Sequence, residues 1–169
     1  MTSDILVTQS DRVLRIQLNR PDKKNALTGA MYDAMREAIA AANDDAQVRV
    51  IFIHGQPDCF TAGNDLADFQ DLERMRRERP AMKFLEVISA AVKPIVAAIN
   101  GPAVGIGTTM LLHCDLAYAG QSAKFQMPFV TLGLCPEGSS SFALGRMAGQ
   151  ARAAELLLLG ERFSAEQAE

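Results

Sequence analysis

Residues 95–110 read IVAAINGPAVGIGTTM and pass from one apolar run through a glycine-rich turn into another. The first run is short and uncharged, as in a buried strand, and the second predicts a helix over residues 106–113. Residues 51–66, IFIHGQPDCFTAGNDL, repeat the order of strand, glycine turn and helix. Strands and helices that alternate in this way predict an α/β fold rather than a sandwich or a helical bundle.

The N-terminal part adds a predicted hairpin and an amphipathic helix. Apolar and polar residues alternate in residues 13–19, which favours pairing with residues 5–9 across a turn at Ser10-Asp11. Thr28 is a good N-cap, and apolar residues recur behind it at helical spacing. We therefore expect a helix over residues 29–43.

Residues 48–54, VRVIFIH, form an apolar run typical of a strand that is buried on both faces in a parallel sheet. Near the end, residues 163–167 (FSAEQ) have the pattern of a capping box that opens a helix, and the sequence stops two residues later. We expect one domain over residues 1–169 in a truncated chain. The other predicted elements are a helix that begins near Asn64-Asp65 and runs into the charge-rich DLERMRRERP, a helix over 82–92, a strand over 115–120, and helices over 139–148 and 151–159.

The composition argues against several partner classes. A net charge of −3 suggests no basic surface for nucleic acid or for an anionic membrane. Residues 94–114 are uncharged and long enough to span a bilayer, but their prolines and glycines favour a strand, a turn and a helix. Three cysteines without a CxxC pair indicate reduced thiols in the cytoplasm, and with two histidines we expect no metal site.

The glycine turns admit more than one kind of site. Residues 105–110 begin like a GxGxxG dinucleotide motif but lack its third glycine and the acid that follows. No GxSxG nucleophile elbow occurs, and Cys135 would need His54 or His113 as its base. Two strand–turn–helix segments suggest a pair of backbone N–H groups that stabilises an oxyanion, although both turns can equally serve only for packing.

One isolated acid stands in a segment with very little charge. Between Leu116 and Gly145 the only charged residues are Lys124 and Glu137. The sequence Pro-Glu-Gly suits a surface turn, so the residue pattern alone leaves a solvated turn and a functional carboxylate open.

Six motifs occur in order along nearly the whole chain: Asn19-Arg20-Pro21, Asn25-Ala26-Leu27, residues 60–66 (FTAGNDL), Lys93-Pro94, residues 100–107 (NGPAVGIG) and Cys114-Asp115. Together they resemble the crotonase (enoyl-CoA hydratase/isomerase) superfamily. The resemblance implies a spiral of ββα repeats, followed by C-terminal helices that help build trimers and that this chain lacks. It implies an acyl-CoA thioester substrate, no cofactor apart from that coenzyme A, and a homotrimer or dimer of trimers at full length. A peroxisomal location is open for a eukaryotic source.

By motif position, the resemblance assigns the oxyanion-binding N–H groups to Asn64 and Ile106. The loop over residues 23–27 corresponds to a family loop near the coenzyme A, where lysines suit its phosphates. Asp65 has the position of a helix cap. The implied substrate-binding residues are Lys24, Ala26, Leu27, Ala62, Gly63, Asp65, Leu66, Gly105 and Phe129.

The carboxylates distinguish the possible reactions. Hydratases of the superfamily place two glutamates at positions that correspond to Thr109 and Phe129, so both acids are missing here. Glu137 resembles the catalytic acid/base of peroxisomal-type Δ3-Δ2-enoyl-CoA isomerases. One carboxylate suffices to move a proton from C2 to C4, whereas hydration favours two. The resemblance thus implies an isomerase with weak hydratase activity; a crotonase-type hydratase, hydrolase or decarboxylase and a non-catalytic acyl-CoA-binding scaffold stay open.

Overall fold

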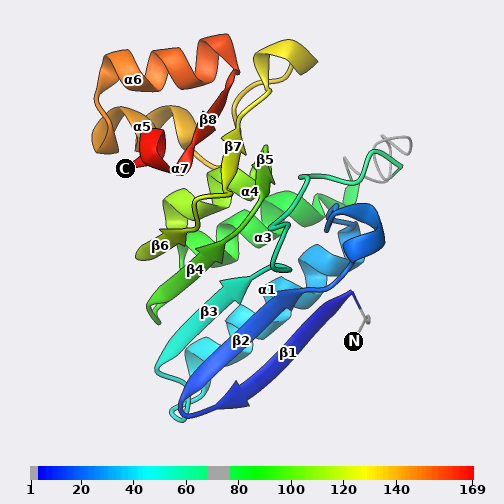
Figure 1. Cartoon of the computed structure of the whole chain (residues 1–169). Helices are drawn as coiled ribbons and strands as arrows, with labels where there is room; N and C mark the ends of the chain where they lie inside the picture. Colours follow the sequence, from blue (N-terminus) through cyan, green and yellow to red (C-terminus); the bar gives the residue numbers. More distant parts are fainter. Residues whose placement is uncertain (1–3, 68–76) are drawn as a thin grey trace.

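The computed structural model describes residues 4–67 and 77–169, which build two β-sheets (Figure 1). In the larger sheet β1 pairs with β2 in antiparallel fashion, and all other neighbouring strands are parallel. The predicted α/β fold and the predicted hairpin are confirmed. In spatial order the five strands are β1 (Ile5–Ser10), β2 (Val13–Leu18), β3 (Val50–His54), β4 (Ile95–Ile99) and β6 (Leu116–Ala119).

One face of the larger sheet is buried beneath two helices. Figure 1 shows α1 (Gly29–Asp44) and α3 (Pro80–Ser89) on the same side of the sheet. Buried residues alternate with half-buried ones along β2 and β3, as in strands that are fully covered on one face only. The expectation that β3 is buried on both faces is therefore wrong. Its half-buried side chains Phe52 and His54 stack on each other, with ring centroids 5.1 Å apart.

Helix α1 follows from its cap and its apolar spacing, as predicted. Thr28 Oγ1 accepts a hydrogen bond from Met31 N at 3.3 Å. On the inner side Tyr32 packs against Phe84 of α3, with ring centroids 5.6 Å apart. Met31, Met35 and Ile39 recur every four residues on the buried face, and Tyr32 lies beside them.

The sequence does not predict the smaller sheet. Its three strands pair in the order β5-β7-β8, and each has only three residues, too few to show an alternating pattern. β5 lies in the glycine turn after β4, so residues of this turn also pair with another strand, β7. The strands are β5 (Pro102–Val104), β7 (Lys124–Gln126) and β8 (Arg162–Ser164).

The helices predicted over residues 139–148 and 151–159 are largely confirmed, although the second is continued as a π-helix. The helix expected over residues 106–113 divides into α4 (Ile106–Thr109) and a 3₁₀ turn, η3 (Met110–His113). The predicted capping box is confirmed, because Ser164 and Gln167 exchange side chain–backbone hydrogen bonds. The remaining elements are η1 (Pro21–Lys23), η4 (Val130–Leu132), α5 (Ser140–Met147), α6 (Gln150–Ala154), the π-helical η5 (Glu155–Leu159) and α7 (Ala165–Ala168).

None of the helices in the described part of the chain has both the length and the apolar character that a bilayer crossing requires.

The helix expected to begin near Asn64-Asp65 does not begin there. Asn64 forms an isolated parallel bridge with Leu27, and the chain turns at Leu66 and Ala67. Pairing with the first loop (residues 19–28, between β2 and α1) therefore overrides the local capping signal at this point. The part of the predicted helix over residues 68–76 lies outside the described residues.

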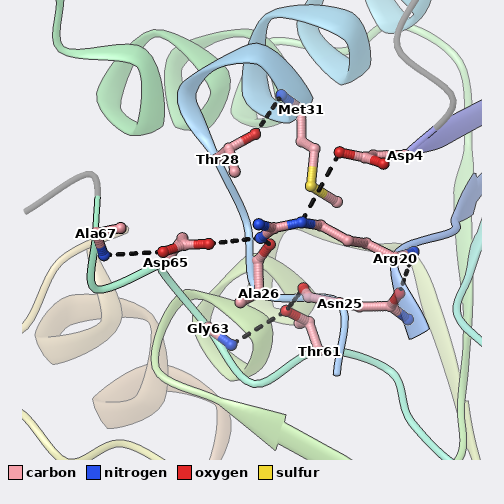
Figure 2. A network of polar contacts seen from close by, with 10 residues as sticks. All are labelled: Asp4, Arg20, Asn25, Ala26, Thr28, Met31, Thr61, Gly63, Asp65 and Ala67. Atoms are coloured by element: carbon pink, nitrogen blue, oxygen red, sulfur yellow. Dashed lines mark hydrogen bonds and ion pairs between the residues drawn. The ribbon is translucent and has the colours of Figure 1, made fainter. Parts of the chain in front are cut away.

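Asn25 ties the first loop to the segment that follows β3 (Figure 2). The side chain is fully buried; its Oδ1 accepts from Arg20 N at 2.7 Å, and its Nδ2 donates to Phe60 O at 2.9 Å and to Cys59 O at 3.2 Å. Its carbonyl accepts from Thr61 Oγ1 at 2.6 Å. The φ of Asn25 is +53°, a left-handed conformation that asparagine tolerates better than most residues.

We expect Asn25→Ala to lower the free energy of unfolding by about 2–4 kcal/mol, because it leaves one buried N–H group and two buried carbonyls without this partner. Urea unfolding followed by circular dichroism measures the loss. Lys24→Ala is the matched control, since Lys24 has a φ of +50° but an exposed side chain. Equal unfolding midpoints for the two variants would contradict the structural role of Asn25.

Candidate active site

Two turn segments lie side by side beyond the ends of β3 and β4. Thr61 N donates to Pro102 O at 3.0 Å, and Val104 N donates to Thr61 O at 3.1 Å. Gly63 has a φ of +90°, and a Cβ atom there would stand 2.7 Å from Val104 O. Only glycine permits this approach, so the segments expected to carry the N–H pair are close neighbours.

The Asn64 peptide is fixed on both sides, whereas its own N–H group is free. Leu27 N donates to Gly63 O at 2.8 Å, and Asp65 N donates to Leu27 O at 2.9 Å. The Asn64 side chain accepts a hydrogen bond from the Tyr32 hydroxyl. Within residues 4–67 and 77–169 the Asn64 N–H group has no acceptor, so its hydrogen-bonding capacity is unused there.

Ile106 provides a second free N–H group. Gly105, with a φ of +56°, directs the chain into α4 and donates its own N–H to Gln126 O at 2.8 Å. The N–H groups of Thr108 and Thr109 close the first turn on Gly105 O at 2.9 and 3.0 Å. The Ile106 N–H precedes these donors and finds no acceptor among the described residues.

The Glu137 side chain points into the protein. Thr109 Oγ1 donates a hydrogen bond to Glu137 Oε1. Glu137 Oε2 is buried and has no partner among the described residues. A surface turn would leave both oxygens in water, so the solvated-turn interpretation of this acid is wrong. A buried polar atom without a partner is uncommon in folded proteins and calls for an explanation.

Burial raises the pKa of the Glu137 carboxyl above its ordinary value, and the hydrogen bond from Thr109 opposes part of this rise. The loop around Glu137 packs against α3, α4 and η3. His113 Nε2 lies 2.9 Å from Gly138 O, and a Cβ atom at Gly138 would stand 3.4 Å from both Leu85 and Thr109 side-chain atoms. The carboxyl is therefore held in place rather than free to sample solvent.

Helix α4 connects the two halves of the site. Ile106 begins the helix with its free N–H group, and Thr109 ends it with the hydroxyl that contacts Glu137. Three residues of helix advance the chain by about 4.5 Å along the axis. One rigid helical turn thus fixes the position of the Ile106 N–H group relative to the Thr109 hydroxyl. The motifs did not identify Thr109 as a partner of Glu137.

The other predicted site residues divide into two groups. The loop over residues 24–27 lies beside residues 62–65: Ala62 N donates to Lys24 O at 2.9 Å, and the Lys24 side chain is exposed. Leu66 is 77% exposed, and Phe129 is buried in the hydrophobic core. For Leu66 and Phe129 the structure gives no contact with the N–H groups or with Glu137.

A partly buried ion pair holds the two loops together (Figure 2). Arg20 Nη1 donates to Asp65 Oδ2 at 2.5 Å and to Ala26 O at 2.9 Å. Hydrogen bonds from Arg20 and from Ala67 N hold the pKa of Asp65 below its usual value. Asp65 therefore joins the two loops and does not stand at the start of a helix, as its predicted capping position implied. Arg20 stands in the Asn-Arg-Pro motif of residues 19–21. This motif is the signal that could have identified Arg20 as the partner of Asp65, but the sequence did not predict a role for Arg20.

The chain is similar in sequence and in fold to known proteins. The family model for Enoyl-CoA hydratase/isomerase matches residues 8–169. Enoyl-CoA delta isomerase 2 of Rattus norvegicus is 39% identical over 170 residues, which cover 97% of this chain and 43% of that protein. The 2,3-dehydroadipyl-CoA hydratase of Escherichia coli (strain K12) is 34% identical over 170 residues, covering 99% of this chain and 66% of the hydratase.

A solved structure of an enoyl-CoA hydratase/carnithine racemase from Magnetospirillum magneticum AMB-1 is 46% identical and superposes with a TM-score of 0.95. The match covers 100% of this chain and 67% of that one. The chain spans less than half the length of the rat relative and about two-thirds of the other two. The family match over nearly all residues and the shared fold confirm the resemblance found in the motifs: this chain belongs to the enoyl-CoA hydratase/isomerase family, the crotonase superfamily.

Proposed function

We propose that this protein is an enoyl-CoA isomerase that converts a 3-enoyl-CoA into the conjugated 2-enoyl-CoA. The observation that carries the proposal is the Glu137 carboxyl, whose Oε2 is buried and has no partner in the part of the chain that the structure describes. Family membership supports an acyl-CoA thioester as the substrate. The exposed Lys24, in the loop beside residues 62–65, is suited to the phosphates of coenzyme A.

In the proposed reaction, the thioester oxygen accepts hydrogen bonds from the N–H groups of Asn64 and Ile106. These bonds stabilise the negative charge that develops on the oxygen when C2 loses a proton. Glu137 takes that proton, and the electrons of the C2–H bond form a dienolate. The dienolate then takes the proton back from Glu137 at C4, the double bond comes to lie between C2 and C3, and the carboxylate is restored.

The raised pKa of Glu137 suits this work. A carboxylate with an ordinary pKa is a weak base at neutral pH, whereas burial makes its ionised form a better proton acceptor. Because the same group must return the proton, a pKa nearer to the working pH favours both halves of the transfer. The partly buried setting also limits exchange of the proton with water.

Hydration is the alternative that the relatives favour most directly, since names of both isomerases and hydratases occur among them. Hydration must activate a water molecule and deliver a proton to carbon. Thr109 and Phe129 stand where the motif pattern of hydratases has glutamates, which favours isomerisation. Hydrolysis or decarboxylation of an acyl-CoA would use the same N–H pair, and a scaffold would bind acyl-CoA without turnover.

Glu137→Gln should lower isomerisation of a 3-enoyl-CoA by about 10²–10⁴-fold, because glutamine keeps the shape and cannot accept the proton. Formation of the conjugated product is followed by absorbance. Affinity for acyl-CoA should change little, since the proposed oxygen site is made of backbone. Glu161→Gln, at an exposed position, is the control. A Glu137→Gln variant that works at the parent rate would overturn the proposed role.

Hydratase turnover should stay far below the median enzyme value of about 10 per second. The measurement supplies 2-enoyl-CoA and quantifies 3-hydroxyacyl-CoA by chromatography. Turnover near the median, together with absent isomerisation, would favour the hydratase alternative.

The raised pKa of Glu137 also predicts a pH-dependent stability. The folded chain binds this proton more tightly than the unfolded chain, in which the carboxyl titrates near 4.5. The stabilisation is complete below pH 4.5 and is lost as the pH rises through the raised value. We expect the free energy of unfolding of the parent, relative to Glu137→Gln, to fall across that interval in urea titrations. A difference independent of pH would indicate an exposed carboxyl.

A further inference from the structure

We propose that Thr109 is a positioning residue that reserves Glu137 Oε2 for proton transfer, so that the proton leaves C2 and returns to C4 through one oxygen of the carboxyl. This inference rests on the proposed isomerisation and adds a second residue to it. The two observations behind it are the hydrogen bond from Thr109 Oγ1 to Oε1 and the absence of a described partner at the buried Oε2.

The hydroxyl distinguishes the two carboxylate oxygens in both protonation states. While Glu137 is ionised, Thr109 donates its proton to Oε1, which leaves Oε2 as the unoccupied acceptor. After C2 is deprotonated, the new O–H bond forms on Oε2, because Oε1 already accepts from Thr109. The carboxylic acid then donates from Oε2 to C4 and returns to its starting state with atoms and charge balanced.

Thr109 is fixed well enough to make this distinction. The side chain is fully buried, and the Thr109 N–H group is bonded to Gly105 O at 3.0 Å. Its helix turn begins with Ile106, which carries one of the two N–H groups proposed for the thioester oxygen. The distance between that oxygen and Oε1 is thereby set by the backbone of α4 and by one buried side chain.

Few charged groups compete with this contact. His113 on η3 approaches the carbonyl of Gly138. Burial raises the pKa of the Cys114 thiol to about 12, so this thiol is neutral. The other titratable side chains of α3, the Glu137 loop and α5 are exposed, and they are Lys83, Glu86, Cys135 and Arg146.

The test compares Thr109→Val, which keeps the shape and removes the hydroxyl, with Thr109→Ser, which keeps the hydroxyl. Carbon-13 NMR of labelled glutamate follows the Glu137 carboxyl, and Glu137→Gln assigns its signal. We expect Thr109→Val to raise the pKa of this carboxyl, because a donor to the ionised form is lost. Thr109→Ser should titrate like the parent, as should Thr8→Val, which makes the same change on the distant strand β1.

Kinetics provide the second readout. For Thr109→Val we expect kcat for isomerisation to fall about tenfold or more, with KM within about twofold of the parent. The acid limb of its kcat/KM profile should move to higher pH, and Thr109→Ser should restore the parent profile. If Thr109→Val does not fold, Thr109→Ala, which also lacks the hydroxyl, takes its place.

The outcomes separate this inference from the proposed function. An unshifted carboxyl titration in a folded Thr109→Val variant overturns the role of Thr109, whatever the activity. A parent-like kcat and pH profile in that variant overturns it as well. A shifted titration in a protein that does not isomerise 3-enoyl-CoA overturns the proposed reaction and leaves the contact confirmed.

Discussion

The buried side chain of Asn25 is the constraint on which the rest of the site depends. It holds the first loop against residues 59–61, and Thr61 in turn pairs with the strand β5. From β5 the chain passes through Gly105 directly into α4, whose last residue contacts Glu137. An uninterrupted series of covalent and hydrogen-bonded steps therefore runs from the first loop to a carboxyl that lies more than a hundred residues later.

Two acids near the site have opposite environments. Asp65 is paired with Arg20, and its pKa is lowered, so it stays ionised and serves to join two loops. Among the described residues no cation pairs with Glu137, and burial raises its pKa, so it can change its protonation state. When environments separate the pKa values of two carboxyls in this way, the one with the raised value is the candidate for proton transfer. The structure thus favours Glu137 over Asp65 without reference to any motif.

Much of the fold and of the candidate site could be predicted from the sequence, where periodicity extends over several residues or where a cap or motif lies in one short segment. The hairpin, α1 and the parallel strands follow from periodicity and capping, and the motifs pointed to Asn64, Ile106 and Glu137. The three-residue strands β5, β7 and β8 could not be found, because they show no period and pair only with distant segments. The contacts of Thr109 and Arg20 join residues 28 and 45 positions apart, and periodicity and capping do not reveal such contacts. At Asn64 the local capping signal was misleading, since a bridge to Leu27 prevailed.

The free N–H groups of Asn64 and Ile106 belong to the main chain, whereas the acid belongs to a side chain on a separate loop. A substitution at Asn64 or Ile106 by any residue except proline alters a side chain and retains the N–H group, while replacing Glu137 by a residue other than aspartate removes the acid. Evolution can therefore exchange the reactive group of such a scaffold without rebuilding the place where a carbonyl oxygen would rest. Divergence by relocating a single acid is then a short evolutionary step, and relatives named as isomerases and as hydratases are what such a history would leave.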